Sequence, residues 1–240
     1  MQMSNLNENN HVLEVSLLLI IMGFTVYYLA IKSIRIGNFF LRRWGVDQGQ
    51  IYLIHFQRLL GIILFGIIPV FLYIYLFDRQ LENIGLSGFI DITTMYYTVS
   101  IGAILILANA YVTKKDDCLK NYPQIRTKRW TIGLIVMSAL GWTGYIFSYE
   151  LLFRGILLSE SIAAVGIPFA IVINILLYAL VHIPKGRNET VGSVFFGIVL
   201  CLITIHTGAV WAAFLTHAIL ALSNEWFAIH HNKEIIIKVR

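Results

Sequence analysis

The stretch WTIGLIVMSALGWTGYIFSYELLFRGILL, residues 130–158, holds one carboxylate and one guanidinium in an otherwise uncharged and mostly apolar run. Glu150 and Arg154 are four residues apart, so on a helix they share a face and can pair. Ionisable residues within membrane helices usually mark a function. The alternative is a structural salt bridge that only holds a helix bundle together, because a buried charge is costly unless it is paired.

The composition around this stretch is that of a membrane protein. Of the 240 residues, 58% are hydrophobic and only 13% are charged, which is unlike an ordinary soluble domain. A helix needs about 20 residues to cross the hydrocarbon core of a bilayer. We therefore predict an all-α fold, a polytopic membrane helical bundle of about seven transmembrane helices. The apolar stretches are residues 12–31, 59–77, 93–112, 130–158, 161–182, 191–205 and 209–229, and the sixth is the shortest.

Lysine and arginine are concentrated in alternate connecting segments. The segments after the first, third, fifth and seventh stretches hold 16 of the 18 basic residues, and Arg58 is counted in the first of these segments. The positive-inside rule makes these segments cytoplasmic. The first stretch lacks a preceding basic residue and a cleavage site, so we expect it to remain in the mature protein. The prediction is an integral membrane protein, with the N-terminus outside and the C-terminus inside.

We expect one membrane domain with four parts. These are a polar N-terminal tail (1–11), N-terminal transmembrane helices (12–129), a core of helices (130–229) and a basic C-terminal tail (230–240), and both tails should be loose. The net charge of +5 indicates topology and attraction to anionic lipid. No basic patch is interleaved with exposed aromatic residues, so no nucleic acid partner is expected. Cys118 and Cys201 lie in a loop and a helix, which argues against a disulfide.

Polar side chains recur at one depth of the predicted bundle. Gly166 and Pro168 predict a turn between the fourth and fifth stretches, and Glu150 and His182 each lie 16 residues from position 166. At 1.5 Å per residue, equal arms bring these two side chains to a similar depth, in the cytoplasmic half. His182 also ends a stripe of polar residues spaced by four that includes Asn174.

The last two stretches add three further candidates. His217 and Asn224 are seven residues apart and share a helix face, whereas Glu225 is turned by about 100° from Asn224. Glu189 follows a polar turn, and its simpler interpretation is a first-turn acidic residue favoured by the helix dipole. A histidine on a helix is more often structural, but two histidines that share the membrane with Glu150 favour a functional site.

This set of side chains suits hydrolysis in a membrane pocket. A glutamate can act as general base on water while a histidine or asparagine polarises a peptide carbonyl. His182, His217 and Glu150 could instead hold a divalent metal such as Zn²⁺ and leave one position for water. The sequence contains no His-Glu-x-x-His, no Gly-x-Ser-x-Gly and no pair of membrane aspartates, which are the marks of other intramembrane proteases.

Three motifs resemble those of the CAAX-protease and bacteriocin-processing (CPBP, or Abi) family of intramembrane proteases. The resemblance covers residues 130–227. It implies an all-helical bundle with a conical cavity open toward the cytosol, and endopeptidase cleavage near the membrane. The motifs are Glu150-Leu-Leu-Phe-Arg154-Gly155, Tyr178-x-x-x-His182 and His217 in the last helix.

Two positions depart from the family pattern. The first motif is usually Glu-Glu-x-x-x-Arg, and its first Glu is the one assigned to activating water, but this sequence has Tyr149 there. Tyrosine loses its proton near pH 10 and is a poor base at neutral pH. The third motif is usually His-x-x-x-Asn, but Ala221 stands four residues after His217.

The sequence also resembles a bacterial subset of the family with a single Glu in the first motif. In that subset Glu150 or Glu189 would be the base, with His182 and His217 as zinc ligands or oxyanion stabilisers. Asn224 or Glu225 would supply the subset's acidic or amide residue two turns after the last His. We favour Glu150 as the base, because Arg154 can keep it ionised at membrane depth.

Three functions from different classes remain open at this point. The first is an intramembrane endopeptidase that cleaves a membrane-associated protein or peptide. The second is a catalytically inactive relative that acts as a membrane scaffold or regulator, since a fold does not guarantee activity. The third is a small transporter, which the lack of repeated halves disfavours. A close cluster of Glu150, His182 and His217 with room for water would favour the protease.

Overall fold

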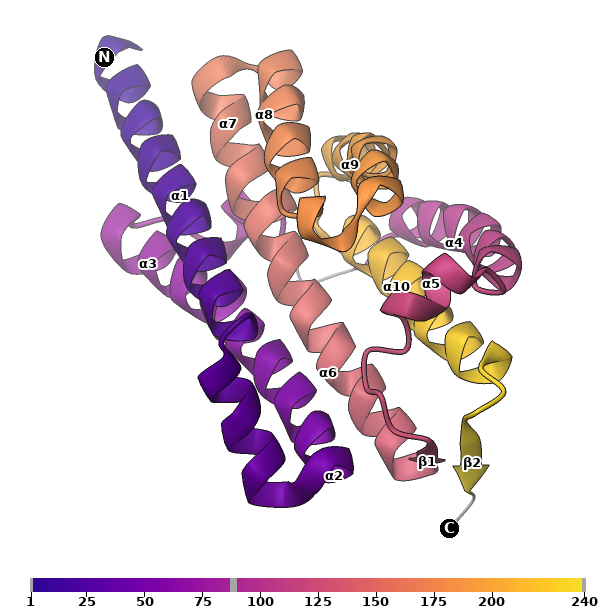
Figure 1. Ribbon diagram of the computed structural model, residues 1–240. Coiled ribbons are helices and arrows are strands. Elements are labelled where there is room, and N and C mark those ends of the chain that lie inside the picture. The colour runs from indigo at the N-terminus through magenta and orange to yellow at the C-terminus, as the bar shows by residue number, and fades with distance from the viewer. Residues whose placement is uncertain (1, 87–89, 239–240) are drawn as a thin grey trace.

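The computed structural model describes residues 2–86 and 90–238 of the chain. Within these residues, seven helical segments are long and apolar enough to cross a membrane. They lie against one another as one bundle, and the two ends of the chain lie at opposite ends of it (Figure 1). The predicted all-α polytopic bundle is therefore confirmed. The seven segments are residues 10–31, 34–77, 92–112, 132–165, 167–185, 187–207 and 211–231.

The N-terminal helices extend further than their apolar stretches. Helix α1 (Gln2–Ile31) is helical from residue 2, so most of the predicted polar tail continues the helix. Helix α2 (Ile34–Ile62) runs through the π-helical segment η1 (Ile63–Ile67) into α3 (Ile68–Phe77). The residues predicted as a connecting segment are thus helical, with one break at Gly45, where φ is 76°.

A loop region, one long helix and one short helix lie between the first helices and the core. The 3₁₀ turn η2 (Leu81–Ile84) precedes α4 (Ile92–Val112), whose first turn is capped because the Asp91 carboxylate accepts a hydrogen bond from the Thr94 N–H at 2.8 Å. The short helix α5 (Asp116–Asn121) and strand β1 (Arg129–Thr131) follow. Helix α4 packs against the last helix, α10 (Trp211–His231).

The predicted hairpin of the fourth and fifth stretches is confirmed. Helix α6 (Ile132–Glu150), the π-helical segment η3 (Leu151–Leu157) and α7 (Leu158–Val165) form one continuous rod. The chain reverses at Gly166, where φ is 79°, a value that favours glycine. Helix α8 (Ile167–Leu180) returns beside α7 with Pro168 in its first turn.

The last helices close the bundle around α10. After the 3₁₀ turn η4 (Ile183–Lys185), helix α9 (Arg187–Thr207) packs on α8, and α10 contacts α4, α6 and α9 (Figure 1). Strand β2 (Ile236–Lys238) pairs in parallel with β1, so the predicted loose C-terminal tail is held by backbone hydrogen bonds over these residues. Residues 239 and 240 of that tail lie outside the described part.

Candidate active site

Glu150 and His217 form the centre of the site. Glu150 ends α6 and is completely buried, and its Oε1 atom lies 2.5 Å from Nδ1 of His217 on α10. The other carboxylate oxygen, Oε2, lies 3.2 Å from Nη1 of Arg154, one turn further along. Neither side chain of the Glu150–Arg154 pair has any exposed surface. The predicted pairing is therefore present, and the histidine adds a third member.

Directly after Glu150 the helix changes from the α form to the wider π form of η3, which contains Arg154. In η3 the Leu158 N–H bonds to the Phe153 carbonyl, five residues back, and such π-helical segments are frequent at functional sites. The same carbonyl accepts a second hydrogen bond from the Asn174 amide on α8, at 2.6 Å. Asn174, the first residue of the predicted polar stripe, thus fastens η3 to α8.

His182 is held in one orientation at the end of α8. Its Nδ1 atom lies 2.7 Å from the carbonyl oxygen of Tyr178, the preceding residue of its motif. A carbonyl only accepts hydrogen bonds, so Nδ1 carries the hydrogen and Nε2 keeps a free lone pair in the neutral ring. The same reasoning applies to His217, whose Nδ1 donates to the Glu150 carboxylate.

A cavity of about 960 Å³ brings the motifs together. His182 and His217 both line it, and so does Asn224, whose Oδ1 atom is buried without a hydrogen-bond partner. Glu150 does not line the described cavity, because it lies behind His217. The cavity's lining mixes apolar side chains with polar ones, and its other members include Trp142, Tyr145, Ile146, Tyr149, Tyr178, Lys185, Glu189, Phe196, Leu220 and Ala221.

Tyr149 occupies the position of the family's first glutamate and is 4% exposed. Its ring stacks on Phe153, with 4.7 Å between ring centroids. Its centroid lies 6.4 Å from that of His182 and 5.9 Å from that of His217. The Tyr149 hydroxyl is buried and has no hydrogen-bond partner among the described residues. A buried hydroxyl without a partner is costly and is rare in folded proteins, so this group is an exception within the site.

Glu189 lies in the first turn of α9, as the sequence predicted. Its carboxylate accepts a hydrogen bond from the Asn121 amide at 3.1 Å, and Lys185 lies 3.9 Å away. About a quarter of its side chain is exposed (26%), so Glu189 belongs to the solvent-facing part of the cavity. These contacts agree with the simpler interpretation of Glu189 as a helix-terminus residue.

Glu225 and Arg58 form a second buried pair, away from the cavity. Arg58 lies 3.5 Å from Glu225, and the Ser138 hydroxyl accepts a hydrogen bond from Arg58 at 2.9 Å. Only 3% of Arg58 is exposed, so its assignment to a connecting segment was wrong. The guanidinium also lies 4.7 Å from the centre of the Trp142 ring. Glu225 therefore ties α10 to α2 and α6, while Asn224 faces the cavity.

Two titratable groups of the 113–129 loop also line the cavity. Burial, reinforced by the Glu189 carboxylate, raises the pKa of the Cys118 thiol and the pKa of the Tyr122 hydroxyl. Both groups thus keep their protons at neutral pH. Because a thiolate is the reactive form of cysteine, Cys118 is a poor nucleophile in this setting.

The predicted metal ligands are His182, His217 and Glu150. Among the described residues, no three His, Cys, Asp or Glu side chains are grouped closely enough to hold one ion. One nitrogen of His217 and one of His182 are already used for hydrogen bonds, and the Glu150 carboxylate is paired with Arg154. A metal bound by His182, His217 and Glu150 therefore stays a prediction.

Comparison with known proteins identifies the region that carries this site. Residues 130–223 match the family model of the type II CAAX prenyl endopeptidase Rce1-like proteins. None of the curated proteins and none of the solved structures compared with the chain matches it. The matched residues include both histidines, Glu150 and Arg154. The resemblance to the CPBP family is thus confirmed over this region: the chain is an integral membrane protein, and its residues 130–223 match the model of the Rce1-like CAAX proteases.

Proposed function

We propose that the protein is an intramembrane endopeptidase that cleaves a membrane-associated protein or peptide, with His217 as the general base. The observation that carries this proposal is the hydrogen bond between His217 and a buried, arginine-paired Glu150 beside a cavity of about 960 Å³. The expected role of Glu150 as the base passes to His217, because His217 reaches the cavity and Glu150 does not.

Glu150 acts through His217 as a positioning residue. A carboxylate that accepts the Nδ1 hydrogen fixes the tautomer with Nε2 free and stabilises the imidazolium formed when that nitrogen takes a proton. Arg154 balances the negative charge of Glu150 within the membrane. His182 has a backbone carbonyl instead of a carboxylate as its partner, so it is the weaker base. It is suited to orienting the water by accepting that water's second hydrogen.

Tyr149 supplies the hydrogen bond that the substrate oxygen needs. Both histidine Nε2 atoms are acceptors in their neutral rings, so neither can stabilise the negative oxygen of a tetrahedral intermediate. The Tyr149 hydroxyl, which has no partner among the described residues, is a donor, and the Tyr149 ring contacts the rings of both histidines edge-on. The Asn224 amide, which also lines the cavity, is a further donor, but it lies two turns beyond His217.

The reaction then balances without a covalent enzyme intermediate. Water forms a bond to the peptide carbonyl carbon while His217 Nε2 takes one of its protons. The carbonyl oxygen becomes negative and accepts a hydrogen bond from Tyr149. When the C–N bond breaks, His217 returns the proton to the leaving nitrogen. A carboxylic acid and an amine leave, and no step requires a metal ion.

The membrane orientation belongs to the same proposal. We infer that the N-terminus is outside, the C-terminus is inside and the cavity opens toward the cytoplasm of a bacterial cell. Lys185, Glu189 and the 113–129 loop line the open part of the cavity. The basic segments after α4 and α8 meet there, which supports a cytoplasmic opening through the positive-inside rule.

The first experiment compares the membrane proteome and secreted peptides of cells carrying wild-type, Glu150→Gln, His182→Ala or His217→Ala protein, at equal accumulation. Uncut substrate in the three variants is the expected result. If deletion of the gene has a phenotype but no variant changes any cleavage, the protein is the inactive scaffold or regulator instead. Glu189→Gln serves as the matched control, and we expect it to retain cleavage.

A further inference from the structure

The first part of α2 folds back on the second part. Gly45 reverses the chain within α2, and Gly49 then approaches Phe40 so closely that an added Cβ would lie 2.6 Å from the Phe40 carbonyl oxygen. Phe40 also packs on Phe56, with 5.4 Å between ring centroids. We name residues 34–44 the basic arm. One face of the basic arm packs against the rest of α2, and the opposite face points away from it.

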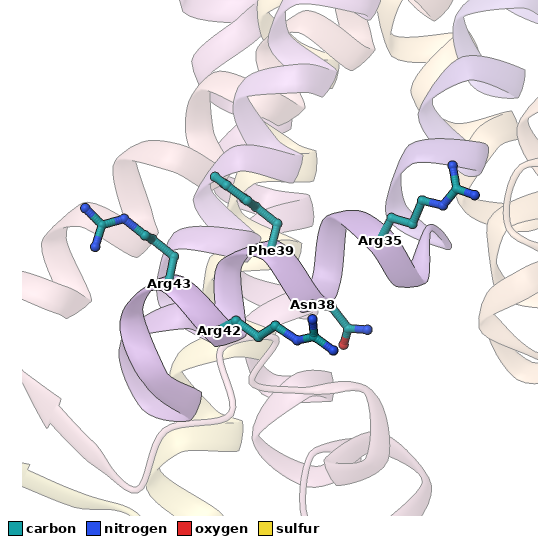
Figure 2. Close-up of a pocket in the computed structure, with 5 residues that line it drawn as sticks. All are labelled: Arg35, Asn38, Phe39, Arg42 and Arg43. Atoms are coloured by element: carbon teal, nitrogen blue, oxygen red, sulfur yellow. The ribbon is translucent and has the colours of Figure 1, made fainter.

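The outward face of the basic arm is strongly cationic. A hollow of about 550 Å³ is lined by Arg35, Asn38, Phe39, Arg42 and Arg43, whose side chains extend from one stretch of α2 (Figure 2). The three arginines are exposed and form no ion pair with any described residue. Arg35 and Arg42 are two turns apart on one face with Asn38 between them, and Phe39 and Arg43 flank that face.

The position of the basic arm along the chain puts this charge at the membrane boundary. The first membrane span ends at Ile31, directly before the arm. After the reversal at Gly45, residues 46–77 measure about 48 Å as a helix, longer than the hydrocarbon thickness of about 30 Å, so the end of this helix that carries the arm can extend beyond the hydrocarbon core. Ile34 and Phe39 are 78% and 59% exposed and can reach the acyl chains, while Trp44 is an aromatic residue of the kind found at membrane interfaces.

We propose that the basic arm is a binding site for the phosphate groups of anionic phospholipids. Arginine binds phosphate oxygens through two parallel N–H groups, and the lining of the hollow holds three arginines and no carboxylate. The Asn38 amide adds a neutral donor for an ester oxygen. The exposed Ile34 and Phe39 give an attached acyl chain an apolar contact that free phosphate lacks. The site is independent of the proposed peptidase chemistry.

The test measures lipid binding to the purified full-length protein by native mass spectrometry. Dioctanoyl phosphatidylglycerol is the anionic probe, dioctanoyl phosphatidylcholine the zwitterionic one, and glycerol phosphate the anion without acyl chains. We expect the wild-type protein to prefer phosphatidylglycerol. Arg35→Gln, Arg42→Gln and Arg43→Gln together should weaken that binding by roughly a hundredfold, at about fivefold for each arginine.

Matched variants make each outcome decisive. Lys114→Gln, Lys233→Gln and Lys238→Gln remove the same charge from exposed positions elsewhere and should leave phosphatidylglycerol binding within a few-fold of wild type. A third variant has lysine at all three arginine positions and therefore keeps the charge. It should bind the anionic lipid better than the zwitterionic one, and it provides the test if the glutamine variant fails to accumulate. Equal loss in the control variant, equal binding of both lipids, or equally tight binding of glycerol phosphate would overturn the proposal.

Discussion

The Nδ1 atom of His217 lies 2.5 Å from the Oε1 atom of Glu150, and the two residues belong to helices that are not neighbours in the chain. Glu150 is also paired with Arg154 and has no exposed surface, whereas 15% of the His217 side chain is exposed toward the cavity. In the mechanism that we propose, the carboxylate therefore acts on the histidine and not directly on a substrate. Most of the following predictions depend on this arrangement.

Tyr149→Phe should lower kcat by about 10²–10³-fold with little change in KM, because removing one oxyanion donor has effects of that size. The protein should accumulate and unfold like wild type, since none of the described residues forms a hydrogen bond with this hydroxyl. Cleavage kinetics and a thermal unfolding curve of the purified variant check both parts. Unchanged kcat would assign the oxyanion to another donor, and Asn224→Ala would then be the next variant.

Arg154→Met should destabilise the protein by about 3–5 kcal/mol, because it leaves a buried carboxylate without its cation. The Arg154 guanidinium also lies 4.2 Å from the centre of the Tyr178 ring, and Met cannot replace that contact. The free energy of unfolding in a denaturing detergent titration measures the change. Glu150→Gln/Arg154→Met, which removes both charges, should recover part of the stability but no cleavage. Equal stability of Arg154→Met and wild type would contradict the buried ion pair.

Arg58 and Glu225 should couple strongly in a double-mutant cycle. Either Arg58→Met or Glu225→Leu alone leaves one buried charge unpaired and should cost about 3–5 kcal/mol, while the double variant should cost much less than the sum. The same unfolding titration reports all three. Additive losses would mean that the 3.5 Å approach of the two groups contributes nothing to stability.

Cys118 should react slowly with a maleimide at neutral pH and faster as the pH rises. Its pKa is raised by burial and by the Glu189 carboxylate, so the thiolate fraction grows only above the usual thiol range. Glu189→Gln removes a negative charge, lowers the pKa of Cys118 and should speed labelling at a fixed pH. Mass spectrometry of a Cys201→Ala background gives the rate. Labelling by an impermeant reagent in intact cells, before the membrane is opened, would contradict the inferred orientation.

The helical bundle and one contact of the site, the Glu150–Arg154 pair, could be predicted from the sequence. The Glu150–Arg154 pair follows from a spacing of four residues on one helix. The turn at Gly166 follows from glycine and proline chemistry. The hydrogen bond from His217 to Glu150 could not be predicted, because it depends on the relative depth and rotation of α6 and α10, which no local pattern encodes.

Arg58 shows where the sequence argument misled. An arginine at the edge of an apolar stretch resembles a loop charge, but the helix continues without a break from residue 46 to residue 77, so Arg58 lies inside it. Glu225 was the available signal, since it is a carboxylate in an apolar helix without a nearby basic partner. A carboxylate without a partner in one predicted membrane helix and an arginine at the edge of another are a reason to place the two in contact. The π-helical form of η3 had no sequence signal that we can name.

The measurement that tests the central claim most directly is a cycle of Glu150→Gln, His217→Ala and the double variant in one reconstituted cleavage assay, with Glu189→Gln as control. Residues that act as one unit have non-additive effects, and loss of the carboxylate partner of a catalytic histidine can cost about 10⁴-fold in kcat. We predict a loss of about 10³-fold or more in each single variant and no further loss in the double variant. Full cleavage by Glu150→Gln, or single losses that multiply in the double variant, would contradict a Glu150–His217 unit.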